Sequence, residues 1–214
     1  MGVVLRYASI GTINFNYRFL THAHSHIAML GWVYLMLFVL IVHYFVPEKK
    51  PIYTKLFWLT QFAVVGMMLS FPFQGYATVS IAFSTLHIFC SYYFVYLIWK
   101  DHKTESIVTR RLLKTALLFM LLSTAGVWCL GPAVSMLGQA SAFYQIAIQF
   151  FLHFQFNGWF LIAVIAIFFH VLQLKDSKQF RLFFVLLVVS TVLTLALPIY
   201  WFAPHIALYW INGL

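Results

Sequence analysis

Apolar residues run through this chain in six long stretches separated by short polar segments. The stretches fall at about residues 18–46, 53–71, 76–99, 111–137, 141–174 and 181–203. A helix rises about 1.5 Å per residue, so about 20 apolar residues are needed to cross roughly 30 Å of hydrocarbon. The pattern predicts an all-α, polytopic membrane protein with six transmembrane helices in a bundle, forming a single membrane domain over residues 1–214.

Polar residues recur at helical spacing inside two of these stretches. The stretch 141–174 carries Gln145, Gln149, His153 and Asn157, and the stretch 76–99 carries Ser80, Ser84, His87 and Ser91. Residues three or four apart share one face of a helix. Because polar groups in lipid must turn towards protein, we expect both lines to face the interior of the bundle.

The composition agrees with a membrane protein and shows how it is oriented. Hydrophobic residues make up 64% of the chain and charged residues 8%. Eleven Lys and Arg residues follow the first, third and fifth stretches, whereas Arg6 and Arg18 lie on the other side. Basic residues collect in cytoplasmic loops, so we expect a multi-pass protein of the cell (inner) membrane with both termini outside.

The same asymmetry accounts for the net charge of +9, and nucleic acid is therefore not an expected partner. The only acids are Glu48, Asp101, Glu105 and Asp176, and all four fall in predicted loops. A carboxylate proton relay or a carboxylate-ligated di-iron site within the membrane is excluded for this chain.

Histidines are the candidate functional residues. His22, His24 and His26 open the first stretch, and His87 and His153 lie about eleven and twelve residues into the third and fifth. Under the predicted orientation all five fall in the outer half of the bilayer. Intramembrane imidazoles mark functional sites by default, so these five are the candidate metal or cofactor ligands. His22 and His26 share a helix face, whereas His24 points about 160° away from His26.

Two parts of the chain resemble each other at an offset of 127 residues. His26, Gly31, Trp32 and His43 match His153, Gly158, Trp159 and His170, and Tyr17 matches Tyr144. These matches suggest repeat units at about 17–43 and 144–170. In so aromatic a chain, chance similarity is the alternative. The glycines would let a macrocycle or a helix approach the backbone, or would serve ordinary helix packing.

The motif His24-x-His26-x4-Gly31-Trp32, with the aromatic lead Phe15 to Phe19, resembles one helix of the catalytic subunit of heme-copper oxidases. It is most similar to the C-family oxidases and nitric oxide reductases. The resemblance implies that His24 ligates a high-spin heme and His26 a low-spin heme on opposite faces. It covers about 20 residues, the family has twelve or more helices, and the adjacent His-His pair of its copper site is absent. Heme binding is implied, and oxygen or nitric oxide reduction is not.

The residue types agree with one or two b-type hemes. Such a heme needs axial imidazoles and no C-x-x-C-H attachment motif, which this chain lacks. His26 could pair with His153 or with His87, and Arg18, about two turns outward, is placed to meet heme propionates. We therefore expect a heme-binding protein in electron transfer or small-gas chemistry; if it is an enzyme, it is an oxidoreductase.

Three alternatives remain open from the sequence. Each histidine could instead be a buried neutral imidazole that is hydrogen-bonded to a neighbouring helix. The protein could bind or deliver copper through His22 and His26, with Met29, Met67 and Met68 nearby. It could also be a cofactor-free accessory subunit of an oxidase. A homo-oligomer or a larger respiratory complex would provide its partners, within a lipid bilayer.

Overall fold

The computed structural model describes residues 1–8, 10–11, 14, 16–48 and 50–212. Within these residues, six helical spans are long and apolar enough to cross a membrane, which confirms the predicted fold class. They run over Tyr17–Phe45, Pro51–Gln74, Thr78–Asp101, Ile107–Leu137, Ala142–Val171 and Lys178–Phe202. The predicted stretches match these spans to within a few residues.

The chain divides into two compact units, an N-terminal unit (Met1–Lys103) and a C-terminal unit (Thr104–Leu214). The N-terminal unit contains α1 (Gly2–Tyr7), α2 (Tyr17–His26), η1 (Ile27–Val33), α3 (Tyr34–Phe45), α4 (Pro51–Gln74) and α5 (Thr78–Asp101). Within it, α4 packs against α2, η1, α3 and α5, and α1 packs against α2.

The C-terminal unit contains six α-helices and one π-helical segment. They are α6 (Ile107–Leu137), α7 (Ala142–His153), η2 (Phe154–Phe160), α8 (Leu161–Val171), α9 (Lys178–Leu193), α10 (Ala196–Phe202) and α11 (Ile206–Asn212). Here α6 is the central helix and packs against α7, η2 and α8, while α9 contacts η2 and α10 contacts α7.

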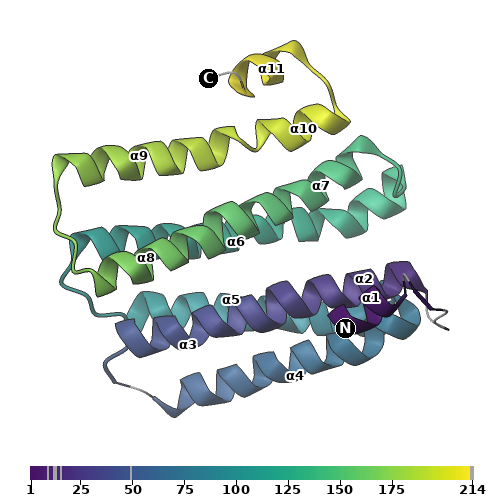
Figure 1. Cartoon of the computed structure of the whole chain (residues 1–214), viewed down its shortest axis with the longest axis horizontal. Coiled ribbons are helices and arrows are strands. Elements are labelled where there is room, and N and C mark those ends of the chain that lie inside the picture. Colours follow the sequence, from purple (N-terminus) through teal and green to yellow (C-terminus); the bar gives the residue numbers. More distant parts are fainter. Residues whose placement is uncertain (9, 12–13, 15, 49, 213–214) are drawn as a thin grey trace. The chain divides into compact units, whose positions relative to one another are not determined.

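Each unit has one long span interrupted by a π-helical segment. Figure 1 shows α2 and α3 as parts of one continuous rod, and α7 and α8 as parts of another. The segments η1 and η2 join these pairs, and each has seven residues. In a π-helix the N–H groups bond five residues back instead of four, an arrangement that often occurs at functional sites.

The element boundaries recur at the offset that the sequence motifs showed. The π-helical segments η1 and η2 begin at Ile27 and Phe154, which are 127 residues apart. The same offset separates the starts of α3 and α8, at Tyr34 and Leu161, and the starts of α4 and α9, at Pro51 and Lys178. The two units therefore share a local backbone pattern over more of the chain than the motifs cover. Duplication as its origin stays a prediction.

Helix starts follow ordinary capping chemistry. Asn16 Oδ1 accepts the N–H groups of Arg18 and Phe19, and Ser106, Ser141 and Ser177 cap the starts of α6, α7 and α9 in the same way. Side-chain oxygens at this position satisfy N–H groups that the first helical turn leaves without partners. These caps lie at the starts of four of the described spans, within a few residues of the positions that the apolar pattern predicts.

Close packing joins α5 to α4 in the N-terminal unit. Gly66 lies directly against the ring of Phe83, and Ser84 Oγ donates a hydrogen bond to Met67 Sδ at 3.3 Å. At the other end of the pair, Asp101 accepts hydrogen bonds from Lys50 Nζ at 2.7 Å and from Tyr53 OH at 3.1 Å. The line of Ser80, Ser84, His87 and Ser91 is half-buried or buried, as expected for an inward-facing polar line.

Candidate functional site

The most distinctive imidazole is that of His26, at the end of α2. Its Nδ1 lies 2.9 Å from the carbonyl oxygen of His22, one turn earlier. This hydrogen bond requires the proton on Nδ1, so Nε2 carries the lone pair, which is the tautomer that a metal ligand needs. Within the described part of the chain, no hydrogen bond occupies His26 Nε2.

Aromatic rings from α4 and from the turn after it surround this imidazole. The ring centroid of Phe71 lies 4.4 Å from that of His26, and the ring of Tyr76 lies 5.7 Å from His26 and 4.9 Å from His22. We call His22, His26, Phe71 and Tyr76 the His26 cluster. Its aromatic rings and the unbonded Nε2 of His26 are suited to a planar aromatic group or a metal ion.

The turn between α4 and α5 positions Tyr76. Gly75 has a φ of 60°, a region that L-residues rarely adopt, and a Cβ there would lie 2.5 Å from the ring of Phe19. Only glycine allows the chain to reverse so tightly beneath that ring. The reversal brings Tyr76 back against the two histidines of α2.

His87 lies in the same unit but makes different contacts. It is 2% exposed, its Nε2 donates to the Leu30 carbonyl at 3.1 Å, and Ser91 Oγ lies 3.4 Å from its Nδ1. Tyr34 packs edge-on against the imidazole, with ring centroids 4.7 Å apart. Both nitrogens of His87 therefore have protein partners.

The π-helical segment explains why the Leu30 carbonyl needs this donor. The N–H of Tyr34 bonds to Met29 and Gly31 instead of Leu30, four residues back. The Leu30 carbonyl thereby leaves the helical ladder, and an unpaired carbonyl in hydrocarbon is costly. His87 supplies the missing hydrogen bond, as the alternative of a buried neutral imidazole requires.

His153 plays a comparable part in the C-terminal unit. Its Nε2 donates to the Thr191 carbonyl at 2.7 Å, and the Asn157 amide lies 3.3 Å from its Nδ1. Thr191 is close to the end of α9, where the N–H of Leu195 turns to Val192. The imidazole again bonds to a carbonyl beside an interruption in a helix.

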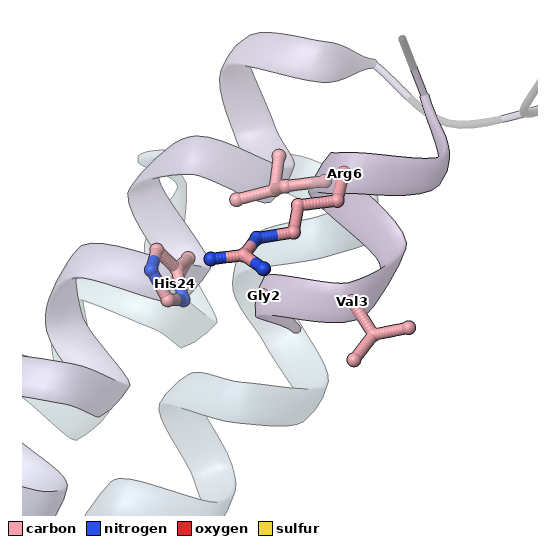
Figure 2. A pocket seen from close by; sticks show the side chains of 5 residues that line it. Gly2, Val3, Arg6 and His24 are labelled. Carbon is pink, nitrogen blue, oxygen red and sulfur yellow. The ribbon is translucent and has the colours of Figure 1, made fainter. Parts of the chain in front are cut away.

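His24 points away from the His26 cluster, as its spacing predicted. It lines a cavity of about 420 Å³ together with Gly2, Val3, Leu5 and Arg6 of α1. Figure 2 shows the Arg6 guanidinium directed towards the imidazole. This positive charge disfavours a bare cation at His24 and favours an anionic or neutral ligand.

The structure therefore distributes the predicted ligands over separate surroundings. Among the described residues, no group of three His, Cys, Asp or Glu side chains is arranged to hold a metal ion. His22, His26 and His87 lie in the N-terminal unit, and His153 lies in the C-terminal unit. Arg18 is exposed in the first turn of α2, near His22. Cys90 and Cys129 are both free thiols.

Several residues around these histidines were not singled out by the sequence. Phe71 could not be distinguished among the 24 phenylalanines, and Tyr34 had no polar neighbour in sequence to draw attention to it. Gln155 is 3% exposed and its Oε1 accepts a hydrogen bond from Ser123 of α6 at 2.9 Å. Gln155 does not belong to the polar line of Gln145, Gln149, His153 and Asn157. A search of the apolar stretches for amide side chains could have found it.

Together these features define a six-span α-helical membrane protein with an aromatic-lined imidazole site in its N-terminal unit. No protein-family model matches the chain, and no curated protein and no solved structure matches it either.

Proposed function

We propose that the protein is a membrane-embedded b-type heme-binding protein, acting in electron transfer or small-gas chemistry, with His26 as the axial ligand. The observation that carries this proposal is the 2.9 Å hydrogen bond from His26 Nδ1 to the His22 carbonyl. It fixes the ring and presents Nε2 for coordination, as the outer contacts of ligating histidines commonly do. The resemblance of the surrounding motif to a helix of heme-copper oxidases supports the same assignment.

The residues of the His26 cluster fit one side of a heme. His26 would hold the iron, the His22 carbonyl would orient the imidazole, and Phe71 and Tyr76 would exclude water from the ligand. Arg18 would meet the propionates at the membrane surface. When bound, the heme would supply one-electron chemistry or a coordination position for a gas.

The second axial ligand is less well matched. His87 and His153 each use Nε2 to donate to a backbone carbonyl, at 3.1 Å and 2.7 Å, so neither fits that role in this structure. Either residue would have to exchange that hydrogen bond for iron. The residues around His26 would thus supply one imidazole to the heme, and the low-spin heme that the resemblance implies would need His87 or His153 to give up its hydrogen bond.

The experiment is an absorption spectrum of the purified protein and of His26→Ala. We expect a Soret band in the parent protein and its loss in the variant. The matched control is His102→Ala, because His102 Nδ1 makes the same bond to a carbonyl four residues back, at 2.8 Å, but sits in the loop after α5. An unchanged Soret band in a folded His26→Ala protein would contradict the ligand assignment.

The spin state tests the second ligand. A high-spin spectrum that is unaffected by His87→Leu or His153→Leu supports one protein ligand. A low-spin spectrum that either substitution converts to high-spin identifies that residue as the sixth ligand.

Copper binding is a second candidate, because His22 and His26 both contact Tyr76 from one helix face. Two imidazoles one turn apart suit Cu(II). Protein without heme but with stoichiometric copper, lost in both His22→Ala and His26→Ala, would favour this function over heme. Met67 is an unfavourable third ligand, since its sulfur already accepts a hydrogen bond from Ser84.

A further inference from the structure

The cavity on the His24 side of α2 joins two helices and combines basic with apolar walls. Four residues of α1 and His24 of α2 line its volume of about 420 Å³, which falls in the usual range of about 300–1,000 Å³ for small-molecule sites. Arg6 and His24 form its polar side, and the Arg6 guanidinium is directed towards the imidazole (Figure 2). Val3 and Leu5 form its apolar side, and Val3 is 82% exposed, so the cavity opens to the surroundings of the protein.

The two polar side chains are hydrogen-bond donors. The guanidinium of Arg6 has five N–H donors and a permanent positive charge, and the imidazole of His24 carries at least one N–H in either tautomer. Among the described residues, none forms a hydrogen bond with the ring nitrogens of His24. A group with several anionic oxygens, such as a phosphate, matches this pair of donors.

Neither carboxylate of the N-terminal unit lies near the cavity. The only acids of this unit, Glu48 and Asp101, follow α3 and end α5, and each forms an ion pair with a lysine there. Phe45, at the end of α3, is about 30 Å from His24 along the helix axis at about 1.5 Å per residue. A headgroup with an ammonium or choline would therefore find no carboxylate at the cavity, whereas an anionic headgroup would meet the positive charge of Arg6.

The length of the first span places the cavity at the level of the lipid headgroups. The span Tyr17–Phe45 has 29 residues, which corresponds to about 43 Å, or about 13 Å more than the hydrocarbon layer. All but one of the Arg and His residues of this span lie in α2, so the excess length belongs at that end. His24 lies about 10 Å from Tyr17 along the axis and thus near the inner edge of the headgroup layer.

We propose that the cavity between α1 and α2 binds a phospholipid with an anionic headgroup. Arg6 and His24 donate hydrogen bonds to the phosphate oxygens, and Val3 and Leu5 contact the glycerol and the first carbons of the acyl chains. Basic pockets beside membrane helices recognise lipid headgroups in this way. The proposal does not depend on heme, because His24 points away from the His26 cluster.

A competition between two lipids tests this site. The full-length protein in detergent is mixed with equal amounts of dioleoylphosphatidylglycerol and dioleoylphosphatidylcholine, and the bound lipids are counted by native mass spectrometry. The acyl chains are identical, so the ratio of bound lipids reports the headgroup. The parent protein should prefer phosphatidylglycerol by about tenfold, and Arg6→Gln and His24→Leu should each remove most of this preference, because each loses a donor to the phosphate.

Two further variants separate the cavity from general surface charge. Arg110→Gln removes the same charge from an exposed position at the start of α6, and it should keep the preference. Leu5→Trp keeps both donors but fills the cavity, and it should lose the preference. If Leu5→Trp retained the preference, or if Arg110→Gln lost it, surface charge alone would select the lipid and the proposed site would be wrong.

Inorganic phosphate distinguishes a lipid from a free anion. Excess phosphate should not displace phosphatidylglycerol, because free phosphate has no acyl chains to contact Val3 and Leu5. Displacement would assign the cavity to a free anion and would overturn the lipid proposal. Equal retention of the two lipids by the parent protein would also overturn it, as would an unchanged preference in both Arg6→Gln and His24→Leu.

Discussion

The two π-helical segments have the same position in their spans and the same local backbone, yet their side chains meet different surroundings. Trp32 in η1 is 71% exposed, whereas Trp159 in η2 is fully buried. Gly31 lies against Val64 of α4, and Gly158 lies against Phe119 of α6. A recurring sequence pattern can specify backbone geometry, while the neighbouring helices decide which face is used.

The histidines show the same difference. His26 and His153 occupy equivalent positions, but His26 bonds within its own helix and His153 bonds across to α9. The donor to the released carbonyl of η1 comes instead from His87. Equivalent position therefore did not imply equivalent chemistry, and the sequence repeat alone would assign both residues one role.

The largest expected contrast is between the two tryptophans. Trp159→Ala should lower the free energy of unfolding by about 3–5 kcal/mol, because it empties a fully buried site. Trp32→Ala should change it by less than about 0.5 kcal/mol. Unfolding in mixed micelles, followed by circular dichroism, measures both. If both variants lost a similar free energy of unfolding, Trp32 would be buried in the purified protein, and the predicted contrast would be wrong.

A smaller contrast is expected between two histidines that bond to released carbonyls. His87→Leu should cost about 1–2 kcal/mol in the same assay, because the Leu30 carbonyl then lies unpaired in a dry interior. His153→Leu should cost less, since His153 is only half-buried and water or lipid headgroups can reach its surroundings more easily. A larger loss of unfolding free energy for His153→Leu than for His87→Leu would contradict this order and would make the bond from His153 to Thr191 the more stabilising one.

The smallest expected change in stability is that of a substitution at Asp176, in the loop after α8. The hydrogen bond from Arg181 holds the pKa of Asp176 below its usual value. A carboxyl group with a depressed pKa in the folded state contributes stability at higher pH, and this stability is lost as the pH falls through the folded-state pKa. Asp176→Asn should therefore flatten the acid limb of the stability curve slightly. A carboxyl NMR titration measures the shift directly, and an unshifted pKa would contradict the ion pair.

The six spans could be predicted from the sequence because membrane thickness imposes a length and composition on each helix. The opposed faces of His24 and His26 followed from helical geometry in the same way. The π-helical segments could not be predicted, since no residue in Ile27–Val33 or Phe154–Phe160 breaks an α-helix in the way that proline does. The Leu30 carbonyl that bonds to His87 therefore could not be predicted either, and neither could the interruption near the end of α9 beside which the Thr191 carbonyl bonds to His153.

The arrangement of aromatic residues at the candidate site was also beyond the sequence. With 24 phenylalanines and 12 tyrosines, the identity of Phe71 and Tyr76 as neighbours of His26 depended on how α4 packs and how Gly75 turns. The proposed heme, the side of the membrane on which the termini lie and the relation to heme-copper oxidases stay predictions.

A π-helical segment holds one residue more than the α-helix it interrupts. Each residue of an α-helix advances the chain by about 100° around the axis, so η1 sets the rotational phase between everything before Ile27 and everything after Val33. Removing one residue there would swing His22 and His26 about a quarter turn away from Phe71 while Tyr34 and the rest of α3 kept their places. The extra residue thus sets the rotation of α2 relative to α3, and this rotation turns His22 and His26 towards Phe71.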